Sequence, residues 1–202
     1  MPLPEQTVNG ATKAALRRDL LARRRSLPPA LAEAYSRAAV RAAWRLPALA
    51  HARRLALYLP ARGELDCTPL AVQAWRRGRS VFVPVVVGDA LRFAPFEPDS
   101  ELRANRFGLL EPACHRRAWR TARQLDVIVA PLAGFDLEGG RLGMGGGFYD
   151  RALAHRHRSS TAGRPHFIAL AFELQKHPGL PIEHWDVRLD AVVTELATYR
   201  FA

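Results

Sequence analysis

The sequence predicts an α/β fold, a single-domain layered structure in which helices flank a largely parallel sheet and two helices precede the first strand. Continuous apolar runs, most clearly residues 126–130 and 167–172, are typical of parallel strands buried on both faces. Segments with helical character alternate with such runs, as βα units require. No repeat or internal linker divides the 202 residues, so we expect one domain.

The N-terminal region is predicted to be helical after a short tail. Residues 1–11 contain two prolines, an asparagine and a glycine without periodicity, and we expect a flexible tail followed by a domain over 12–202. Leucines on one face predict a helix over 13–27. Pro28 and Pro29 end it and begin a second helix, which we expect to extend to about residue 46.

Strands and helices then alternate. Strands are predicted at residues 54–59, 80–87, 91–96, 126–130, 167–172 and 191–194, and helices at 68–77 and 148–157. Ligands of open α/β sheets bind beyond the carboxyl ends of the strands. The segments that follow the strands at 54–59, 126–130 and 167–172 are therefore the candidate site.

The net charge of +11 raises the question of nucleic-acid binding. Lys13 and Lys176 are the lysines, so the other 28 of the 30 basic residues are arginines, and these are scattered along the chain. No zinc-finger spacing or RNA-binding aromatic motif accompanies them. We interpret them as a solvated basic surface that attracts small anionic ligands, and we expect no nucleic-acid partner.

Composition also bears on the cellular setting. No apolar run approaches the roughly 20 residues that cross a bilayer, and the basic N-terminal region lacks the apolar segment of a signal peptide. Cys67 and Cys114 are too few for a disulfide scaffold and have no C-x-x-C spacing. We therefore expect a cytoplasmic protein with reduced thiols and no membrane association.

The glycine-rich stretch GGRLGMGGGFYDR, residues 139–151, is the most informative segment. Its glycines let backbone N–H groups converge on an anion, and Arg141 can add a charge-assisted donor. The predicted helix that follows would add its positive end. Neither the P-loop pattern nor the dinucleotide pattern is present. A simple structural turn is the alternative, and we favour a phosphate site.

Two aspartates are candidate metal ligands. Asp150 lies in the first turn of the predicted helix, where it would either complement the helix dipole or hold magnesium. Asp186, in the LPIEHWD segment at 180–186, supplies a second carboxylate. Magnesium usually takes one or two carboxylates together with phosphate oxygens and water. Neighbouring Glu183 and His184 are weaker candidates.

These motifs together resemble the 5-formyltetrahydrofolate cyclo-ligase family, also called methenyltetrahydrofolate synthetases. PLAGFD at 131–136 and RLGMGGGFYDR at 141–151 carry the resemblance most specifically. Four other pieces agree in order, and the similarity spans about residues 13–195. These pieces are Lys13-x-x-Leu16-Arg17, YLP at 58–60 with Glu64, NRFGLLEP at 105–112, and the 180–186 segment with DAVVT at 190–194.

The resemblance implies an ATP- and magnesium-dependent conversion of 5-formyltetrahydrofolate to 5,10-methenyltetrahydrofolate. It implies catalytic roles for Arg141 and Asp150, and magnesium ligation by Asp150 and Asp186. The implied ATP-binding residues are Lys13, Arg17, Arg141, Leu142, Gly143, Met144, Gly145, Gly146, Gly147, Phe148 and Tyr149. The implied substrate-binding residues are Leu59, Glu64, Phe107 and Tyr149.

Some relatives have Arg or Lys where this chain has Met144 and Gly146, and Tyr where it has Phe148. The missing cations would shift phosphate binding onto Arg141, Lys13 and Arg17. We expect a monomer. Two rival functions stay open: a sugar-phosphate isomerase or CoA-transferase-like enzyme on a similar sheet, and a basic nucleic-acid-binding module. The first would need no ATP, and the second would bind nucleic acid in a strongly salt-dependent manner.

Overall fold

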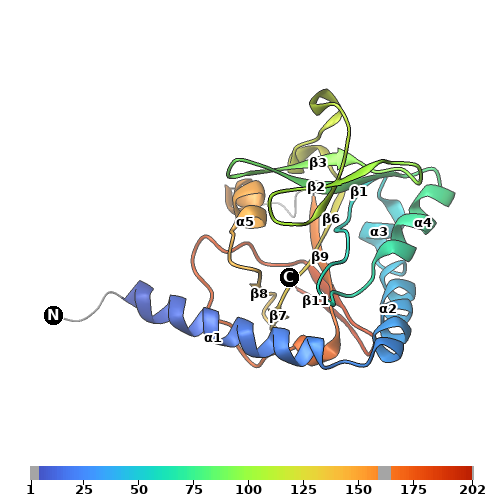
Figure 1. The fold of residues 1–202 in the computed structure, drawn as a ribbon. Helices are drawn as coiled ribbons and strands as arrows, with labels where there is room; N and C mark the ends of the chain where they lie inside the picture. The colour runs from blue at the N-terminus through green and yellow to red at the C-terminus, as the bar shows by residue number, and fades with distance from the viewer. Residues whose placement is uncertain (1–4, 159–164, 202) are drawn as a thin grey trace.

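The computed structural model describes residues 5–158 and 165–201 and contains a seven-stranded sheet in the order β11-β10-β9-β6-β1-β2-β3 (Figure 1). The five inner strands are parallel, and the edge strands β11 and β3 pair antiparallel with their neighbours. The strands are β1 Arg54–Ala56, β2 Ser80–Val87, β3 Ala90–Pro95, β6 Val127–Ala130, β9 His166–Leu170, β10 Ala191–Val193 and β11 Thr198–Arg200. The predicted largely parallel α/β sheet is confirmed.

Each face of the sheet is covered by different elements. The helices are α1 Glu5–Arg25, α2 Pro29–Ala43, α3 Pro47–His51, α4 Thr68–Arg76 and α5 Phe148–Leu153. Helices α2, α3 and α4 lie together on one side of the sheet in Figure 1, and α5 lies on the other. Strand β6 shows why both faces need cover, since Val127 and Val129 belong to the core on the α2 side while Ile128 and Ala130 belong to the opposite core.

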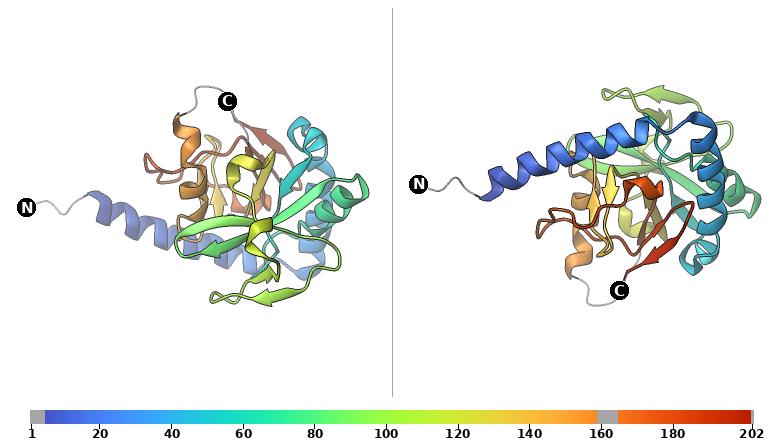
Figure 2. Two further views of the ribbon diagram at one scale, coloured as in Figure 1. Left: turned by 90° about the horizontal axis from the view of Figure 1, so that it is seen from above. Right: turned by 90° about the horizontal axis from the view of Figure 1, so that it is seen from below.

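Helix α1 lies along one end of the sheet rather than on a face. Leu20 and Leu21 bury their side chains against Ala133 and Leu142, and both views in Figure 2 show the helix running beside the rest of the molecule with its N-terminal end extending outward. Residues 5–11, which we expected to lie in a tail, are helical and belong to α1; residues 1–4 lie outside the described part. Extending an established helix costs less than nucleating one, so a single glycine and asparagine do not end it.

Several short elements carried no recognisable sequence pattern. Beyond α3 and β11, the described residues form two small hairpins and four 3₁₀ segments. They are β4 Leu102–Ala104 with β5 Leu110–Pro112, β7 Gly134–Phe135 with β8 Arg141–Leu142, and the 3₁₀ segments Arg116–Ala118, Ala122–Gln124, Ala154–Arg158 and Glu173–Gln175. Within the described residues, no helix combines the length and apolar character needed to cross a membrane.

The strand order creates a switch point in the centre of the sheet. From β1 the chain proceeds to β2 on one side, whereas β6 lies on the other side and leads outward to β9 and β10. Loops that leave the carboxyl ends of β1 and β6 therefore diverge, which is where open α/β sheets form ligand crevices.

Candidate active site

A cavity of about 1090 Å³ opens at this switch point. Tyr58 and Leu59 enter it from the loop after β1, and Pro131 enters it from the loop after β6. The structure brings all the sequence-predicted site residues to its walls: Lys13, Arg17, Leu59, Glu64, Phe107, Arg141, Leu142, Gly143, Met144, Gly145, Gly146, Gly147, Phe148, Tyr149, Asp150 and Asp186. Residues up to 173 positions apart in the chain thus share one cavity.

The glycine loop adopts backbone conformations that favour glycine. Gly145 and Gly147 have φ angles of 96° and 64°, and Gly147 is the residue that immediately precedes α5. A Cβ atom at Gly147 would lie 2.7 Å from Nη1 of Arg151. Both features explain why the loop is rich in glycine and leaves its backbone open to the cavity.

Helix α5 contributes less to anion binding than the sequence suggested. The predicted helix over 148–157 is only six residues long, Phe148–Leu153, and continues as a 3₁₀ segment. A helix of six residues has few aligned peptide dipoles, so its positive end is weak. The positive charge of the cavity therefore comes from side chains, and Arg141, Lys13 and Arg17 are the ones that lie at the glycine loop and α1.

In the part of the cavity formed by the glycine loop, the cationic side chains lie beside carboxylates and carbonyl oxygens. Arg141 donates from one terminal nitrogen to both Asp150 oxygens, at 3.0 and 3.2 Å, and their side chains are only 6% and 16% exposed. Lys13 Nζ lies 2.8 Å from Asp186 Oδ2 and 3.7 Å from Glu183 Oε1. Arg17 is bound to the loop itself, with Nε donating to the Gly143 carbonyl at 2.6 Å, and burial lowers the pKa of its guanidinium.

Backbone groups fix the two aspartates. The Val187 amide donates to Asp150 Oδ1 at 3.2 Å, and the Glu183 amide donates to Asp186 Oδ2 at 2.9 Å. The segment after Leu180 is thereby held against α5 and α1. Asp150 and Asp186 consequently face the same cavity as the Arg141, Lys13 and Arg17 cations.

The cavity offers carboxylate oxygens as possible magnesium ligands. Among the described residues, no three His, Cys, Asp or Glu side chains cluster as a metal cage would require. Asp150 and Asp186 nevertheless present oxygen ligands in one cavity, next to cations suited to phosphate. These residues fit an ion that keeps water and phosphate oxygens and takes one or two protein carboxylates, which is the usual mode of magnesium.

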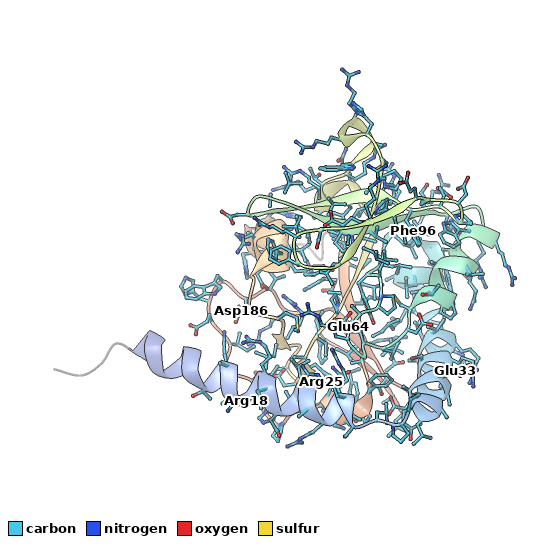
Figure 3. The ribbon with its side chains drawn as sticks, in the orientation of Figure 1. Arg18, Arg25, Glu33, Glu64, Phe96 and Asp186 are labelled. Carbon is cyan, nitrogen blue, oxygen red and sulfur yellow. The ribbon has the colours of Figure 1, made fainter. Side chains whose placement is uncertain are left out.

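The other part of the cavity, after β1, has a different character. Glu64 is half-buried and lies near the middle of the view in Figure 3, whereas Asp186 lies towards the N-terminal half of α1. Burial raises the pKa of the Glu64 carboxyl, although its Oε2 accepts a 3.1 Å hydrogen bond from the Ala61 amide. Burial also raises the pKa of the Tyr58 and Tyr149 hydroxyls, so both stay neutral. Glu64 is thus a desolvated acid on that wall, beside two neutral tyrosine hydroxyls and within the electrostatic reach of Arg24 and Arg62.

An aromatic pair borders the cavity. Phe107, on the loop between β4 and β5, meets Phe148 edge to face with ring centroids 6.2 Å apart. Phe107 is 42% exposed, and Arg106 covers part of its ring at 4.8 Å. An exposed aromatic at a cavity edge is available to stack on a flat ligand ring.

Comparison with known proteins decides the family. The model of the 5-formyltetrahydrofolate cyclo-ligase family matches residues 9–195. The chain belongs to the 5-formyltetrahydrofolate cyclo-ligase family. The Escherichia coli K12 cyclo-ligase is 39% identical over 85% of this chain and 94% of its own, and the Mycolicibacterium smegmatis cyclo-ligase is 32% identical over 91% and 93%. The resemblance inferred from the motifs is therefore confirmed.

Solved structures agree with this membership. The NMR structure of Aquifex aeolicus 5,10-methenyltetrahydrofolate synthetase superposes with a TM-score of 0.79, is 30% identical, and covers 93% of this chain and 92% of that one. The Mycoplasma pneumoniae 5,10-methenyltetrahydrofolate synthetase, 23% identical with a TM-score of 0.68, shares the fold.

The cyclo-ligase cavity also contains residues that sequence reasoning did not single out. Arg106 and Trp185 lie inside the recognised segments 105–112 and 180–186, so membership in these segments could have indicated that they line the cavity. Arg151 is the last residue of the glycine-rich motif, and Arg62 lies between the 58–60 segment and Glu64. The apolar wall residues Pro84, Val86, Leu91, Leu109 and Leu110 had no signal, because an apolar residue that lines a cavity looks like one in the core.

Proposed function

We propose that this protein is an ATP-dependent cyclo-ligase that converts 5-formyltetrahydrofolate and ATP into 5,10-methenyltetrahydrofolate, ADP and phosphate. The observation that carries the proposal is a single cavity with two different ends. One end presents Lys13, Arg17 and Arg141, and the other presents Glu64 with neutral aromatic groups. At about 1090 Å³, it exceeds most single-ligand pockets, which measure about 300–1,000 Å³, and suits two ligands together.

The cationic end suits the triphosphate. Arg141 and Lys13 hold their charges near Asp150 and Asp186, and a triphosphate can replace these carboxylates as the partner of each cation. Arg17, through Gly143, would hold the glycine loop against α1. We place ATP along residues 141–149, with its phosphates towards these three cations.

The Glu64 end suits the pterin. A carboxylate can accept hydrogen bonds from the adjacent N–H groups of a pterin ring, and the desolvated surroundings of Glu64 strengthen such bonds. Leu59 and Tyr149 supply neutral surface for the ring, and Phe107 can stack on the flat part of the folate. This assignment orients the N5-formyl group towards the phosphates.

The chemistry then requires positioning and charge neutralisation. The formyl oxygen attacks the γ-phosphorus as the bond to the ADP oxygen breaks. N10 attacks the activated formyl carbon and loses its proton to water, and the C–O bond breaks to release phosphate. Arg141 and Lys13 stabilise the charge on the transferring phosphoryl group, while the cavity holds N10 close to the carbon. Asp150 and Asp186 would hold magnesium, which supplies charge neutralisation at the phosphates.

The rival functions explain less of the site. An isomerase of sugar phosphates would need one anion subsite and a base, and would leave the separate pterin-type end without a purpose. A nucleic-acid module would have no use for carboxylates inside its cationic surface. The rivals also make different predictions, because neither consumes ATP in response to a folate.

The proposal is tested by mixing the purified protein with MgATP and 5-formyltetrahydrofolate and following the near-ultraviolet absorbance of the methenyl product. The increase should require the protein, ATP, magnesium and folate together. Loss of the signal on omission of any one supports the proposal. A flat trace from folded protein that binds ATP would contradict the assigned substrate, and a rise without ATP would contradict the assigned reaction.

A further inference from the structure

Arg24 is a buried cation that the proposed mechanism does not use. It lies in a run of three arginines at the end of α1, but only Arg24 of the three is buried, with 3% of its surface exposed. A buried guanidinium is costly unless it is bound and its charge is balanced. Its position therefore requires an explanation that a solvated basic surface does not give.

The Arg24 side chain connects two loops that line the cavity. Nη1 donates to the Leu132 carbonyl at 3.1 Å, and Nη2 donates to the Arg62 carbonyl at 3.0 Å. The first carbonyl follows β6 and the second lies in the loop after β1, so the guanidinium bridges the two sides of the switch point. No carboxylate of the described residues lies within 4.0 Å of it as an ion-pair partner.

Of the two bridged loops, the one after β1 contains Glu64. Arg62 has a φ angle of 53°, the one positive φ of a non-glycine residue in the described chain. Left-handed backbone is strained for such a residue and persists only where surrounding contacts hold it. The bond from Arg24 to the Arg62 carbonyl is such a contact, two residues before Glu64.

Arg24 also supplies charge to Glu64. Burial raises the pKa of Glu64, and the positive charges of Arg24 and Arg62 oppose that rise. The other groups that interact electrostatically with this carboxyl are Tyr58, Cys67 and Tyr149, all with pKa values raised by burial and hence neutral. The interaction is mutual, because burial lowers the pKa of Arg24 and Glu64 opposes this.

Helix α1 separates Arg24 from Lys13 and Arg17, the residues proposed to bind ATP. Lys13, Arg17 and Arg24 lie on the same face as the buried Leu20 and Leu21. At 1.5 Å per residue, Lys13 and Arg24 are separated by roughly 16 Å along the helix. One helix face thus serves the phosphate end through Lys13 and Arg17 and the Glu64 end through Arg24.

We infer that Arg24 is a positioning residue for the substrate: its bonds to the Leu132 and Arg62 carbonyls hold the Glu64 loop in the conformation that presents the Glu64 carboxylate to the pterin. This inference rests on the proposed function, since it assigns the pterin to Glu64. It predicts that the loss of Arg24 weakens folate binding selectively, and more so at low pH. Nucleotide binding at the far end of α1 should change little.

The test compares three variants by isothermal titration calorimetry with 5-formyltetrahydrofolate and, separately, with MgATP. Arg24→Gln removes the charge, and Arg24→Lys keeps it but loses the two-carbonyl bridge. Gln175→Met is the matched control, because Gln175 is also buried and donates to the same Leu132 carbonyl at 2.9 Å without bringing a charge to Glu64. Thermal unfolding of each variant measures the purely structural effect.

Arg24→Gln should weaken folate binding about tenfold at about pH 6 and clearly less at about pH 8.5, because a raised carboxyl pKa weakens binding less as the pH increases. MgATP binding should stay within about twofold of the wild type, a change of less than half a kcal/mol. Arg24→Lys should lose about threefold at both pH values. Gln175→Met should lower the melting temperature while folate affinity keeps the wild-type pH dependence.

A pH-independent loss in Arg24→Gln, or an equal loss for folate and MgATP, would overturn the inference. Wild-type folate affinity in both Arg24 variants would overturn it as well. If Arg24→Gln yields no folded protein, the folate-selective loss in Arg24→Lys remains the deciding measurement. Failure of the wild type itself to bind 5-formyltetrahydrofolate would instead refute the proposed function.

Discussion

Replacing Asp150 separates its structural contribution from its proposed catalytic one. In the wild type, Asp150 balances Arg141, whose side chain is 6% exposed and whose Nε is buried without a hydrogen-bond partner in the described structure. Asp150→Ala leaves that charge unpaired and removes the acceptor of the Val187 amide. Breaking a buried pair from one side costs about 3–5 kcal/mol, so we expect a loss of about 4 kcal/mol.

Asp150→Asn should be milder. Its amide oxygen can still accept from the Val187 amide, so we expect a loss of about 2 kcal/mol. At about 2–4 °C per kcal/mol for a chain of this size, the melting temperature should fall by about 8–16 °C for the alanine variant and by about 4–8 °C for the asparagine variant. Both variants lack the carboxylate charge, and turnover should fall about 100-fold or more in each, equivalent to about 2.7 kcal/mol of barrier.

Calorimetric unfolding and initial rates of methenyl formation, at a temperature where both variants are folded, measure the two effects. Glu33→Ala is the control, since it breaks the exposed ion pair with Arg37 and should change stability by less than about 1 kcal/mol. An alanine variant that melts like the wild type would refute the buried-pair argument. An asparagine variant with near-normal kcat would refute the catalytic role of Asp150.

Three further predictions concern other parts of the cavity. Lys13→Met should raise the Kd for MgATP about tenfold, through loss of a charge-assisted contact, and leave the folate Kd unchanged in calorimetric titrations; an equal effect on both ligands would contradict the assignment. Burial raises the pKa of Glu64 in the folded state, so folate affinity should fall as the pH falls through that pKa. Over the same range the Glu64 contribution to stability should rise, because the folded protein binds the proton more tightly than the unfolded chain does. Glu64→Gln should remove both trends, and unchanged pH profiles of folate binding and unfolding in this variant would refute the role of Glu64. In denaturant titrations, Gly147→Ala should lower the free energy of unfolding by about 1 kcal/mol or more, because the φ of Gly147 is 64° and the added methyl group meets Arg151. The control Gly179→Ala has open space around the added methyl group and should change the free energy of unfolding by less than about 0.5 kcal/mol. Equal effects of the two substitutions would contradict the requirement for glycine at position 147.

The parts of the fold that the sequence predicts are those with a strong local pattern. Residues 127–130 and 166–170 form the central parallel strands because their apolar side chains fill the cores on both faces. The strands of β11 and of the β4–β5 hairpin are short and have few buried side chains, so no apolar run marks them, in contrast to the equally short but fully buried β10. The helical start at Glu5 was missed because proline, asparagine and glycine suggested a tail, whereas local propensities are weak compared with helix propagation.

The candidate site was predictable where its residues lie in one contiguous motif. The glycine loop and Asp150 are close in sequence, so a single segment indicated a phosphate site. Arg24 shows the limit of this approach: within a run of three arginines nothing identifies the buried one, and only the packing of α1 against the loops selects it. Likewise Pro84 and Val86 became recognisable as cavity walls only once the strands were assembled.

The measurement that tests the central claim most directly follows one oxygen atom. 5-Formyltetrahydrofolate with heavy oxygen in its formyl group is incubated with the protein and MgATP, and the released phosphate is analysed by mass spectrometry. If ATP activates the formyl oxygen, each turnover should transfer the label into phosphate together with one ADP and one methenyl product. Unlabelled phosphate accompanying methenyl formation would contradict phosphoryl activation of the formyl oxygen in this cavity.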